Sequence, residues 1–165
     1  MPKKREVVAD TSALLSLQSG DLLRQIGERY TLLVTESVVE ELQDFARHDD
    51  ELGDMAREIL RKGEFLDVRT VRTTEEIPEV ESTDNEVYNL ALEEELMLMT
   101  DDVKLCRKIE KVETAFSTYF LGFLVESDEL TTEEALEKLR SMRDRRNWKE
   151  NMIYLTTRKE LEKLL

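Results

Sequence analysis

The chain has 165 residues, of which 40% are hydrophobic and 38% are charged, a composition that suits one globular domain and excludes a disordered protein. Acidic residues outnumber basic ones and give a formal net charge of −14, the opposite of the basic surface typical of nucleic-acid-binding proteins. No apolar run is long enough to span a membrane, and a single cysteine, Cys106, excludes an internal disulfide.

The first residues do not have the pattern of a secretory signal. Residues 1–5 are basic, but Asp10 interrupts the apolar stretch behind them at once. A lone cysteine also fits a reducing compartment. We therefore expect a cytoplasmic protein that does not contact a membrane.

Short apolar runs alternate with longer helical patterns along the first two-thirds of the chain. This alternation predicts βαβ units and an α/β fold with a mostly parallel sheet of about five strands. The predicted strands are residues 6–9, 30–34, 65–68, 96–100 and 112–116. The predicted helices are residues 12–29 with a break near Gly20, a helix that begins at Thr35 or Ser37, and residues 51–62, 84–95 and 103–110. Residues 72–81 have no period, contain Pro78 and are predicted to form a loop.

The last third is predicted to be mainly helical. Residues 119–125 are apolar, and residues 131–145 have the pattern of a helix. A segment around Trp148 follows, and a final helix is expected over residues 158–164. We therefore divide the chain into an α/β domain, residues 1–116, and a helical C-terminal extension, residues 117–165, packed on the same domain.

Acidic residues follow two of the predicted strands directly. Asp10 comes after the first strand, and Asp101 and Asp102 come after the fourth. The carboxyl ends of parallel strands meet at one edge of a sheet, where ligands bind in open α/β folds. These side chains are therefore candidates for a shared site. Each also stands just before a predicted helix, so N-capping is the alternative explanation.

Two further acidic pairs lie near the starts of helices. Glu40 and Glu41 are one turn into the helix after the second strand, and Asp84 and Glu86 are in the first turn of another. Acids in a first turn also favour the helix dipole. Mg²⁺ prefers hard oxygen ligands and takes one or two carboxylates directly. Converging carboxylates therefore predict a Mg²⁺ or Mn²⁺ site of the kind that activates water for phosphodiester hydrolysis.

These motifs resemble those of the PIN-domain nuclease family. The resemblance rests on Val8-Ala9-Asp10-Thr11-Ser12, Val39-Glu40-Glu41-Leu42, the segment from Asp84 to Leu92, and Thr100-Asp101-Asp102. It spans residues 6 to about 115 and implies a three-layer α/β/α sandwich around the parallel sheet. It also implies Mg²⁺- or Mn²⁺-dependent endonucleolytic cleavage of RNA, with residues 1–116 as the catalytic domain.

The resemblance assigns roles to individual residues. The implied catalytic and metal-binding acids are Asp10, Glu41, Asp84 and Asp102. The alternatives at the second, third and fourth of these positions are Glu40, Glu86 and Asp101. The hydroxyls placed to orient ligands or water, with capping as their alternative role, are Thr11, Ser12 and Thr100.

Basic residues near the predicted site are candidates for RNA contact, which an acidic protein needs in order to hold a phosphate backbone. The candidates are Lys104, Arg107 and Lys108 on the helix behind the fourth acid, and Arg143 and Arg146 in the extension. Arginines beside an aromatic such as Trp148 can grip single-stranded RNA through charge and stacking. A solvated charged helix face is the alternative explanation.

The resemblance leaves several functions open. The leading expectation is a metal-dependent endoribonuclease. One alternative is the toxin half of a toxin–antitoxin pair with the same chemistry, controlled by a small antitoxin or another protein regulator. Others are a non-catalytic RNA-binding or scaffold module and a metal-dependent hydrolase of small phosphates. The extension departs from compact toxin members, and its apolar residues 119–125 are a candidate homodimer surface. A single histidine, His48, disfavours a zinc site.

Overall fold

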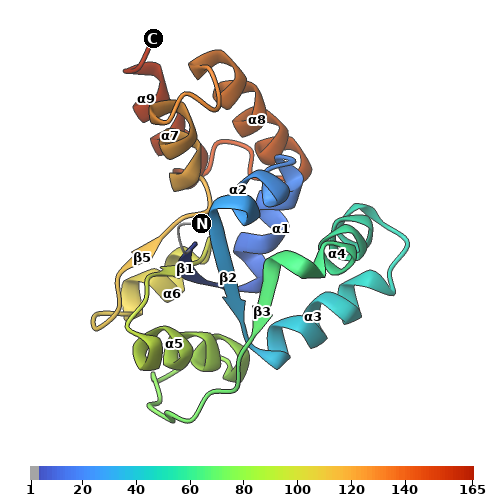
Figure 1. Ribbon diagram of the computed structural model, residues 1–165, viewed down its shortest axis with the longest axis vertical. Coiled ribbons are helices and arrows are strands. Elements are labelled where there is room, and N and C mark those ends of the chain that lie inside the picture. Colours follow the sequence, from blue (N-terminus) through green and yellow to red (C-terminus); the bar gives the residue numbers. More distant parts are fainter. Residues whose placement is uncertain (1–3) are drawn as a thin grey trace.

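The computed structural model describes residues 4–165, so residues 1–3 of the basic N-terminus lie outside the described residues. Its centre is a sheet of five parallel strands in the order β3-β2-β1-β4-β5 (Figure 1). The strands are β1 (Arg5–Ala9), β2 (Tyr30–Val34), β3 (Leu66–Val68), β4 (Leu98–Met99) and β5 (Thr114–Ala115). The predicted α/β class and the parallel sheet of about five strands are confirmed.

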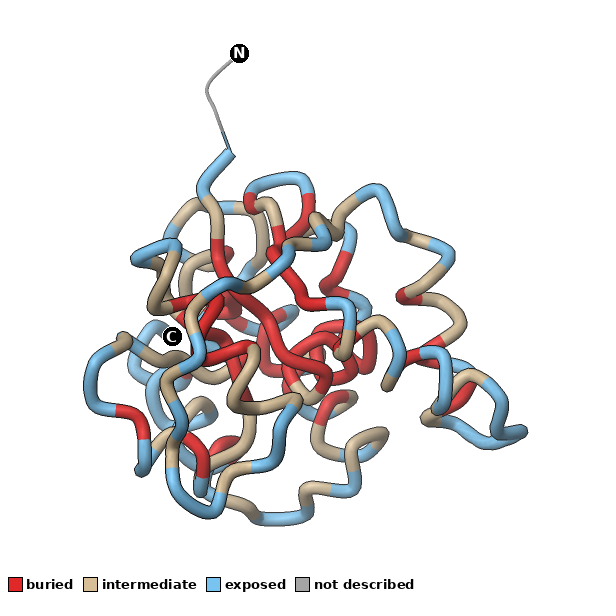
Figure 2. Tube along the Cα trace, turned by 90° about the horizontal axis from the view of Figure 1, so that it is seen from below, coloured by how far each residue is buried: buried red, intermediate tan, exposed pale blue. Residues whose placement is uncertain are grey.

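The middle strand, β1, is buried on both faces. Val7 pairs with Leu32 of β2, and Val8 pairs with both Leu33 of β2 and Leu98 of β4. Val7, Val8 and their neighbours across the sheet are almost fully buried, and Figure 2 shows this buried trace through the middle of the molecule. A strand covered on both faces needs a continuous apolar run, which explains the sequence pattern.

Helices flank the sheet in the three-layer arrangement that the resemblance implies. They are α1 (Thr11–Ser19), α2 (Leu23–Arg29), α3 (Glu36–Ala46), α4 (Glu51–Arg61), α5 (Ser82–Glu94), α6 (Val103–Lys108), α7 (Tyr119–Glu126), α8 (Thr132–Arg145) and α9 (Met152–Glu162). A short 3₁₀ turn, η1 (Gly63–Phe65), precedes β3. None of the helices within residues 4–165 is long and apolar enough to cross a membrane.

The expected break near Gly20 separates α1 from α2. A Cβ atom at Gly20 would lie 2.8 Å from Cγ of Met142, so the glycine lets α8 approach the end of α1 closely. Helix α1 is buried nearly all round, polar residues included, because it lies between the sheet and the other helices.

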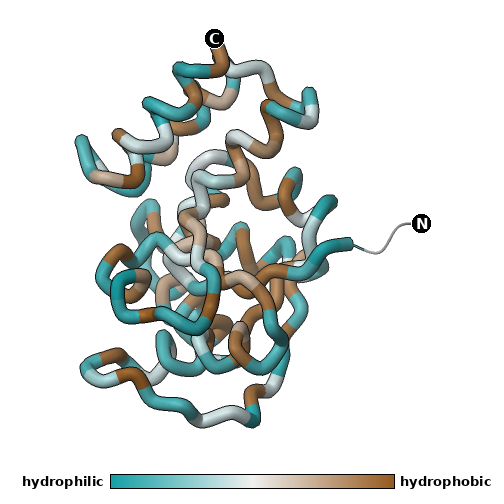
Figure 3. The backbone as a smooth tube through the Cα atoms, turned by 90° about the vertical axis from the view of Figure 1, so that its left-hand side faces the viewer, coloured by the Kyte–Doolittle hydropathy of each residue, from teal (hydrophilic) through white to brown (hydrophobic). Residues whose placement is uncertain are grey.

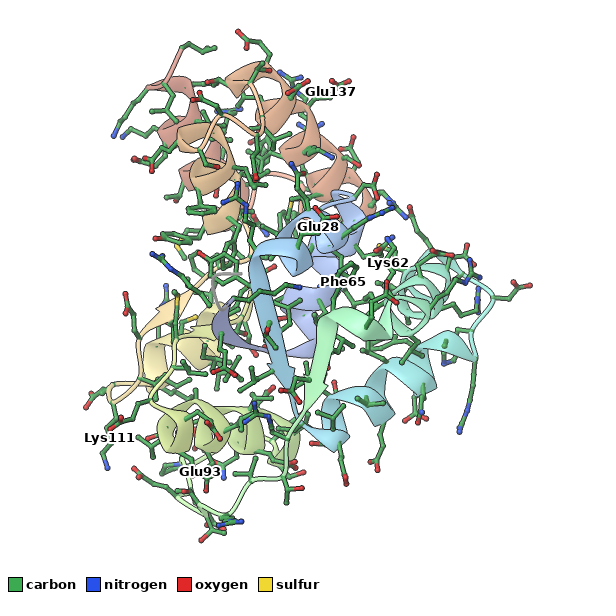
Figure 4. The ribbon with its side chains drawn as sticks, in the orientation of Figure 1. Glu28, Lys62, Phe65, Glu93, Lys111 and Glu137 are labelled. Atoms are coloured by element: carbon green, nitrogen blue, oxygen red, sulfur yellow. The ribbon has the colours of Figure 1, made fainter. Side chains whose placement is uncertain are left out.

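The loop between β3 and α5 is irregular, as predicted, but side chains of α5 bind its backbone. Asn89 accepts a hydrogen bond from the Glu75 amide at 2.9 Å and donates one to the Glu75 carbonyl at 2.7 Å. Glu93, labelled in Figure 4, accepts from the amides of Arg72 and Thr73, each at 3.1 Å. The buried amide of Asn89 therefore replaces the backbone partners that a strand would supply.

The C-terminal helices α7, α8 and α9 gather at one end of the molecule (Figure 1). Hydrophobic and hydrophilic residues alternate along them (Figure 3), as expected for helices buried on one side. Tyr30 at the start of β2 packs edge-on against Phe120 and Phe123 of α7, with ring centroids 4.9 and 5.9 Å apart. These aromatic contacts join α7 to the sheet-containing part of the chain.

The final helix begins earlier than the sequence pattern predicts. The expected start is residue 158, whereas α9 begins at Met152 because Asn151 caps it by accepting a hydrogen bond from the Tyr154 amide at 2.9 Å. The strands β4 and β5 are also shorter than predicted. Their pairing continues past their ends through the Thr100 amide, which donates to the Ala115 carbonyl at 3.0 Å.

Candidate functional site

Two strand ends meet at the carboxyl edge of the sheet. The Asp10 amide donates to the Met99 carbonyl at 3.2 Å, so the parallel pairing of β1 with β4 extends one residue beyond β1. Asp10 and Thr100 therefore stand side by side at this edge.

The Asp10 carboxylate is buried, with 4% of the residue exposed, and both of its oxygens accept hydrogen bonds. Oδ1 accepts from the Ser12 hydroxyl at 2.7 Å and from the Ala13 amide at 2.9 Å, and Oδ2 accepts from the Thr100 hydroxyl. Asp10 is therefore the N-cap of α1. Burial raises its pKa to about 7, the charge of Asp101 adds to this, and the three hydrogen bonds act in the opposite direction.

Two hydroxyls connect Asp10 to the residues after β4. The Thr100 hydroxyl, which donates to Asp10, accepts from the Asp102 amide at 3.1 Å. The Ser12 hydroxyl, which also donates to Asp10, accepts from the Asp101 amide at 3.1 Å. The predicted orienting role of Thr100 and Ser12 therefore has a geometric basis.

The adjacent acids Asp101 and Asp102 point in different directions. Asp102 is the N-cap of α6 and accepts from the Leu105 amide at 3.0 Å. Asp101 accepts from the amide and the hydroxyl of Ser117, each at 2.7 Å, and so faces the connection between β5 and α7. Of the two candidates for the fourth position, Asp102 acts through its charge on Asp84, whereas Asp101 acts through its charge on Asp10.

Asp84 is half-buried in the first turn of α5, and the charges of other predicted site acids act on it. Its pKa is raised to about 6, first by burial and then by the negative charges of Asp102, Glu41 and Glu81. Glu41 is partly buried and Glu40 is exposed, which favours Glu41 for the second position. The structure thus brings Glu41 and Asp102 each within range of the Asp84 carboxylate's charge.

Glu86 occupies a different environment. Its carboxylate accepts from the Ser37 hydroxyl at 2.8 Å, and the hydroxyls of Ser37 and Thr35 lie 3.1 Å apart. This chain of polar groups links α5 to the end of β2. Glu86 therefore joins two elements that carry predicted site acids.

The donor set has the right chemistry for a hard divalent cation, because carboxylates and hydroxyls are the groups that Mg²⁺ and Mn²⁺ prefer. The buried hydroxyl of Thr11 has no hydrogen-bond partner within residues 4–165. A polar atom at the start of α1 is therefore available to bind a divalent cation. However, no three acidic, histidine or cysteine side chains in the described part of the chain stand close enough to share one ion. The acids lie along the carboxyl edge of the sheet, but they are not close enough together to coordinate a single ion.

The basic candidates for RNA contact fall into two groups. Lys104 and Arg107 are exposed on α6 and make no ion pair with any described residue. Lys108 donates to the Glu79 carbonyl at 3.3 Å. In the extension, Arg143 contacts Asp144 at 2.8 Å and Tyr154 at 3.1 Å. The fifth candidate, Arg146, donates through Nε to the Ser16 hydroxyl at 3.2 Å.

Sequence reasoning missed Ser16 and Ser117, the partners of Arg146 and Asp101. A signal for Ser16 exists, because Ser12, Ser16 and Ser19 recur at helical spacing within an apolar segment and so form a polar stripe on α1. Ser117 has no such local signal. His48, which disfavoured a zinc site on sequence grounds, is exposed beyond the end of α3. The half-buried Cys106 lies near the acidic edge: burial raises the pKa of its thiol, and the negative charges of Asp10, Asp101 and Asp102 add to this.

A parallel sheet between helical layers, with acids along its carboxyl edge, defines the class as an α/β protein with a three-layer fold. The sequence model of the PIN domain matches residues 7–117, about two-thirds of the chain. The chain belongs to the PIN-domain family, whose members are generally nucleases that use divalent metal ions.

Nine chains of solved structures match this fold. One is the crystal structure of PAE2754 from Pyrobaculum aerophilum, which is 18% identical in sequence with a TM-score of 0.56. The alignment covers 75% of this chain and 99% of that chain, so it supports the fold and leaves about a quarter of this chain without a counterpart. Among curated proteins, the comparison finds no match.

Proposed function

We propose that the protein is an endoribonuclease that hydrolyses RNA phosphodiester bonds with Mg²⁺ or Mn²⁺. Family membership supports this, and one observation carries it: the negative charges of Asp102 and Glu41 both act on Asp84, while the Thr100 hydroxyl joins the Asp102 amide to the buried Asp10. Carboxylates that repel one another raise the free energy of the metal-free protein. A divalent cation relieves that repulsion, so the acids favour its binding.

Each residue then has a task. Asp10, Glu41, Asp84 and Asp102 are the residues that would hold a divalent cation, which when bound would supply activation of water and neutralisation of charge on the phosphate. Hydrogen bonds to Ser12 and Thr100 orient the Asp10 carboxylate. Because burial raises the pKa of Asp10 to about 7, its proton leaves when a cation takes its place.

The exposed cations of α6 form the proposed RNA contact. Lys104 and Arg107 are one helical turn apart on the helix that begins beside Asp102. Neither makes an ion pair with another residue in the described chain, so both are available to phosphates. Charge reversal of Arg107 should weaken RNA binding and reduce the salt dependence of the affinity by about one phosphate contact. Arg24→Gln on α2 is the control, because Arg24 pairs with Glu28 far along the chain from α6.

Cleavage of labelled RNA tests the proposed activity. We expect cleavage with Mn²⁺ or Mg²⁺, none with EDTA, and little with a DNA oligonucleotide of the same sequence. Asp84→Asn and Asp102→Asn should each lower the rate by about 100-fold or more. Asp50→Asn is a matched control, because Asp50 caps α4 as an exposed residue far from this edge. Cleavage that persists in EDTA or in both site variants would contradict the proposal.

A non-catalytic RNA-binding module is favoured by one observation: both Asp10 oxygens are engaged within the protein and the acids do not close around an ion. Thermal unfolding with and without Mn²⁺ separates the two functions. A nuclease should be stabilised by about 2.7 kcal/mol at a hundredfold excess of Mn²⁺ over its dissociation constant. Asp10→Asn should lose most of that gain. Equal responses of the two proteins would favour the binding module.

A further inference from the structure

Three side chains of α8 bind the end of the helix that begins at Asp10. Lys138 donates to the Gly20 carbonyl at 3.2 Å, Ser141 donates to the Ser19 carbonyl at 3.0 Å, and Arg145 donates to the same carbonyl at 3.3 Å. The last carbonyls of a helix have no partners within it, so α8 acts as the C-terminal cap of α1. The extension is therefore docked against the helix that carries the first site acid.

Arg146, directly after α8, reaches further toward the site. Its Nε donates to the Ser16 hydroxyl at 3.2 Å, and Ser16 in turn donates to the Ser12 carbonyl at 2.9 Å. Arg146 is partly buried, yet no carboxylate in residues 4–165 forms a direct ion pair with it. Burial lowers the pKa of its guanidinium, and the negative charges of Asp101 and Asp10 act against this. Through Ser16, Arg146 is therefore joined to Ser12, whose hydroxyl contacts the Asp10 carboxylate and the Asp101 amide.

Asp101 is the acid that receives this charge. Its side chain is held by the amide and hydroxyl of Ser117, and burial raises its pKa. The Ser16 and Ser117 contacts and the positive charge of Arg146 lower that pKa again and favour the ionised form. A buried carboxylate left without a nearby positive charge is strongly destabilising. Arg146 is thus a positive charge close enough to act on Asp101.

Asp101 also forms part of the backbone turn that presents Asp102. Its amide donates to Ser12, the next amide donates to Thr100, and both hydroxyls donate to Asp10. The side chain of Asp101 faces the extension while its backbone faces the acidic edge. A change in the contacts of the Asp101 side chain should therefore alter the backbone turn that presents Asp102.

We propose that Arg146 is a positioning residue of the acidic site, acting through Ser16 and Asp101 to hold the turn between β4 and α6 that presents Asp102. This rests on the proposed function of that edge. The C-terminal helices then help to position the residues of the site. Arg146 acts through contacts within the protein, whereas the sequence analysis placed it among the candidates for RNA contact.

Arg146→Met, Arg146→Lys, Lys138→Met and Lys159→Met form the test set. Lys138→Met removes a docking contact of α8 that does not reach Asp101, and Lys159→Met removes an exposed charge of α9. We expect Arg146→Met to weaken Mn²⁺ binding by about 10-fold, with most of the loss restored by lysine. The RNA cleavage rate constant should fall by a similar factor while KM for RNA changes little. Neither control should change Mn²⁺ affinity.

Amide NMR spectra of the metal-free protein provide a readout that does not depend on nuclease activity. Arg146→Met should shift the amide resonances of Asp101 and Asp102, and Lys138→Met should not. If the wild type neither binds Mn²⁺ nor cleaves RNA but these resonances shift, the proposed function fails and Arg146 still positions the turn. If Mn²⁺ affinity and the resonances are unchanged in Arg146→Met, the inference is wrong. A rise in KM alone would also overturn it, because Arg146 would then be an RNA contact.

Discussion

Replacing Asp10 by asparagine should change how the stability of the protein depends on pH. The folded protein raises the pKa of Asp10 from 3.8 to about 7, so it binds this proton more tightly than the unfolded chain does. The stabilisation is fully present below about pH 4 and is lost as the pH rises through about 7. At about 1.36 kcal/mol per pKa unit, the difference corresponds to roughly 4 kcal/mol.

The assay is urea unfolding in EDTA, followed by the fluorescence of Trp148, the only tryptophan. Between about pH 4 and pH 8, the wild type should lose roughly 4 kcal/mol more than Asp10→Asn does. Asparagine can still accept the hydrogen bond from the Ala13 amide, so the cap of α1 is retained. Asp50→Asn should leave the wild-type pH dependence unchanged, since Asp50 is an exposed cap. Parallel curves for the wild type and Asp10→Asn would refute the argument from burial.

Three other predictions follow from particular contacts. Glu95, the residue after α5, has a φ of 56°, a left-handed conformation that glycine adopts without strain. Glu95→Gly should therefore raise the free energy of unfolding by about 1 kcal/mol, and a lower free energy of unfolding in urea would contradict this. Asn89→Ala leaves the Glu75 backbone without partners and should cost about 2 kcal/mol, with faster proteolysis of residues 72–81; unchanged cleavage would show that the amide does not hold the loop. Mn²⁺ affinity, measured by calorimetry, should increase as the pH rises through about 6 and about 7, where Asp84 and Asp10 lose their protons, and a flat profile would exclude both as ligands.

The strand-end position of Asp10 could be predicted because it depends on local patterns. An apolar run followed by an acid and a helix fixes the residue at the carboxyl edge of a parallel sheet. The direction in which a side chain points could not be predicted in this way, because it depends on contacts with distant residues. The resemblance selects Asp102 and keeps the adjacent Asp101 as the alternative, but the local pattern does not show where either side chain points, because the partner of Asp101, Ser117, lies sixteen residues further along.

The early start of α9 shows a second limit of local patterns. Met152 to Thr157 have little helical period, and the polar residue that begins the helix, Asn151, is one of many possible caps. Packing of Ile153 and Tyr154 into the core decides the start, and such tertiary contacts are not visible in a window of sequence. The same applies to the acids of the site, whose closeness depends on how α3, α5 and α6 pack.

The cap that α8 provides for α1 has a consequence for synthesis of the protein. The carbonyls at the end of α1 precede their donors by 118 to 126 residues. A ribosome that adds about 5–20 residues per second therefore leaves them uncapped for roughly 6 to 25 seconds. During that time the nascent chain already carries Asp10, while Arg146 has yet to be made. A chain interrupted before α8 would carry the proposed site acids without the helix that caps α1, so the acidic edge is assembled only after α8 has been made.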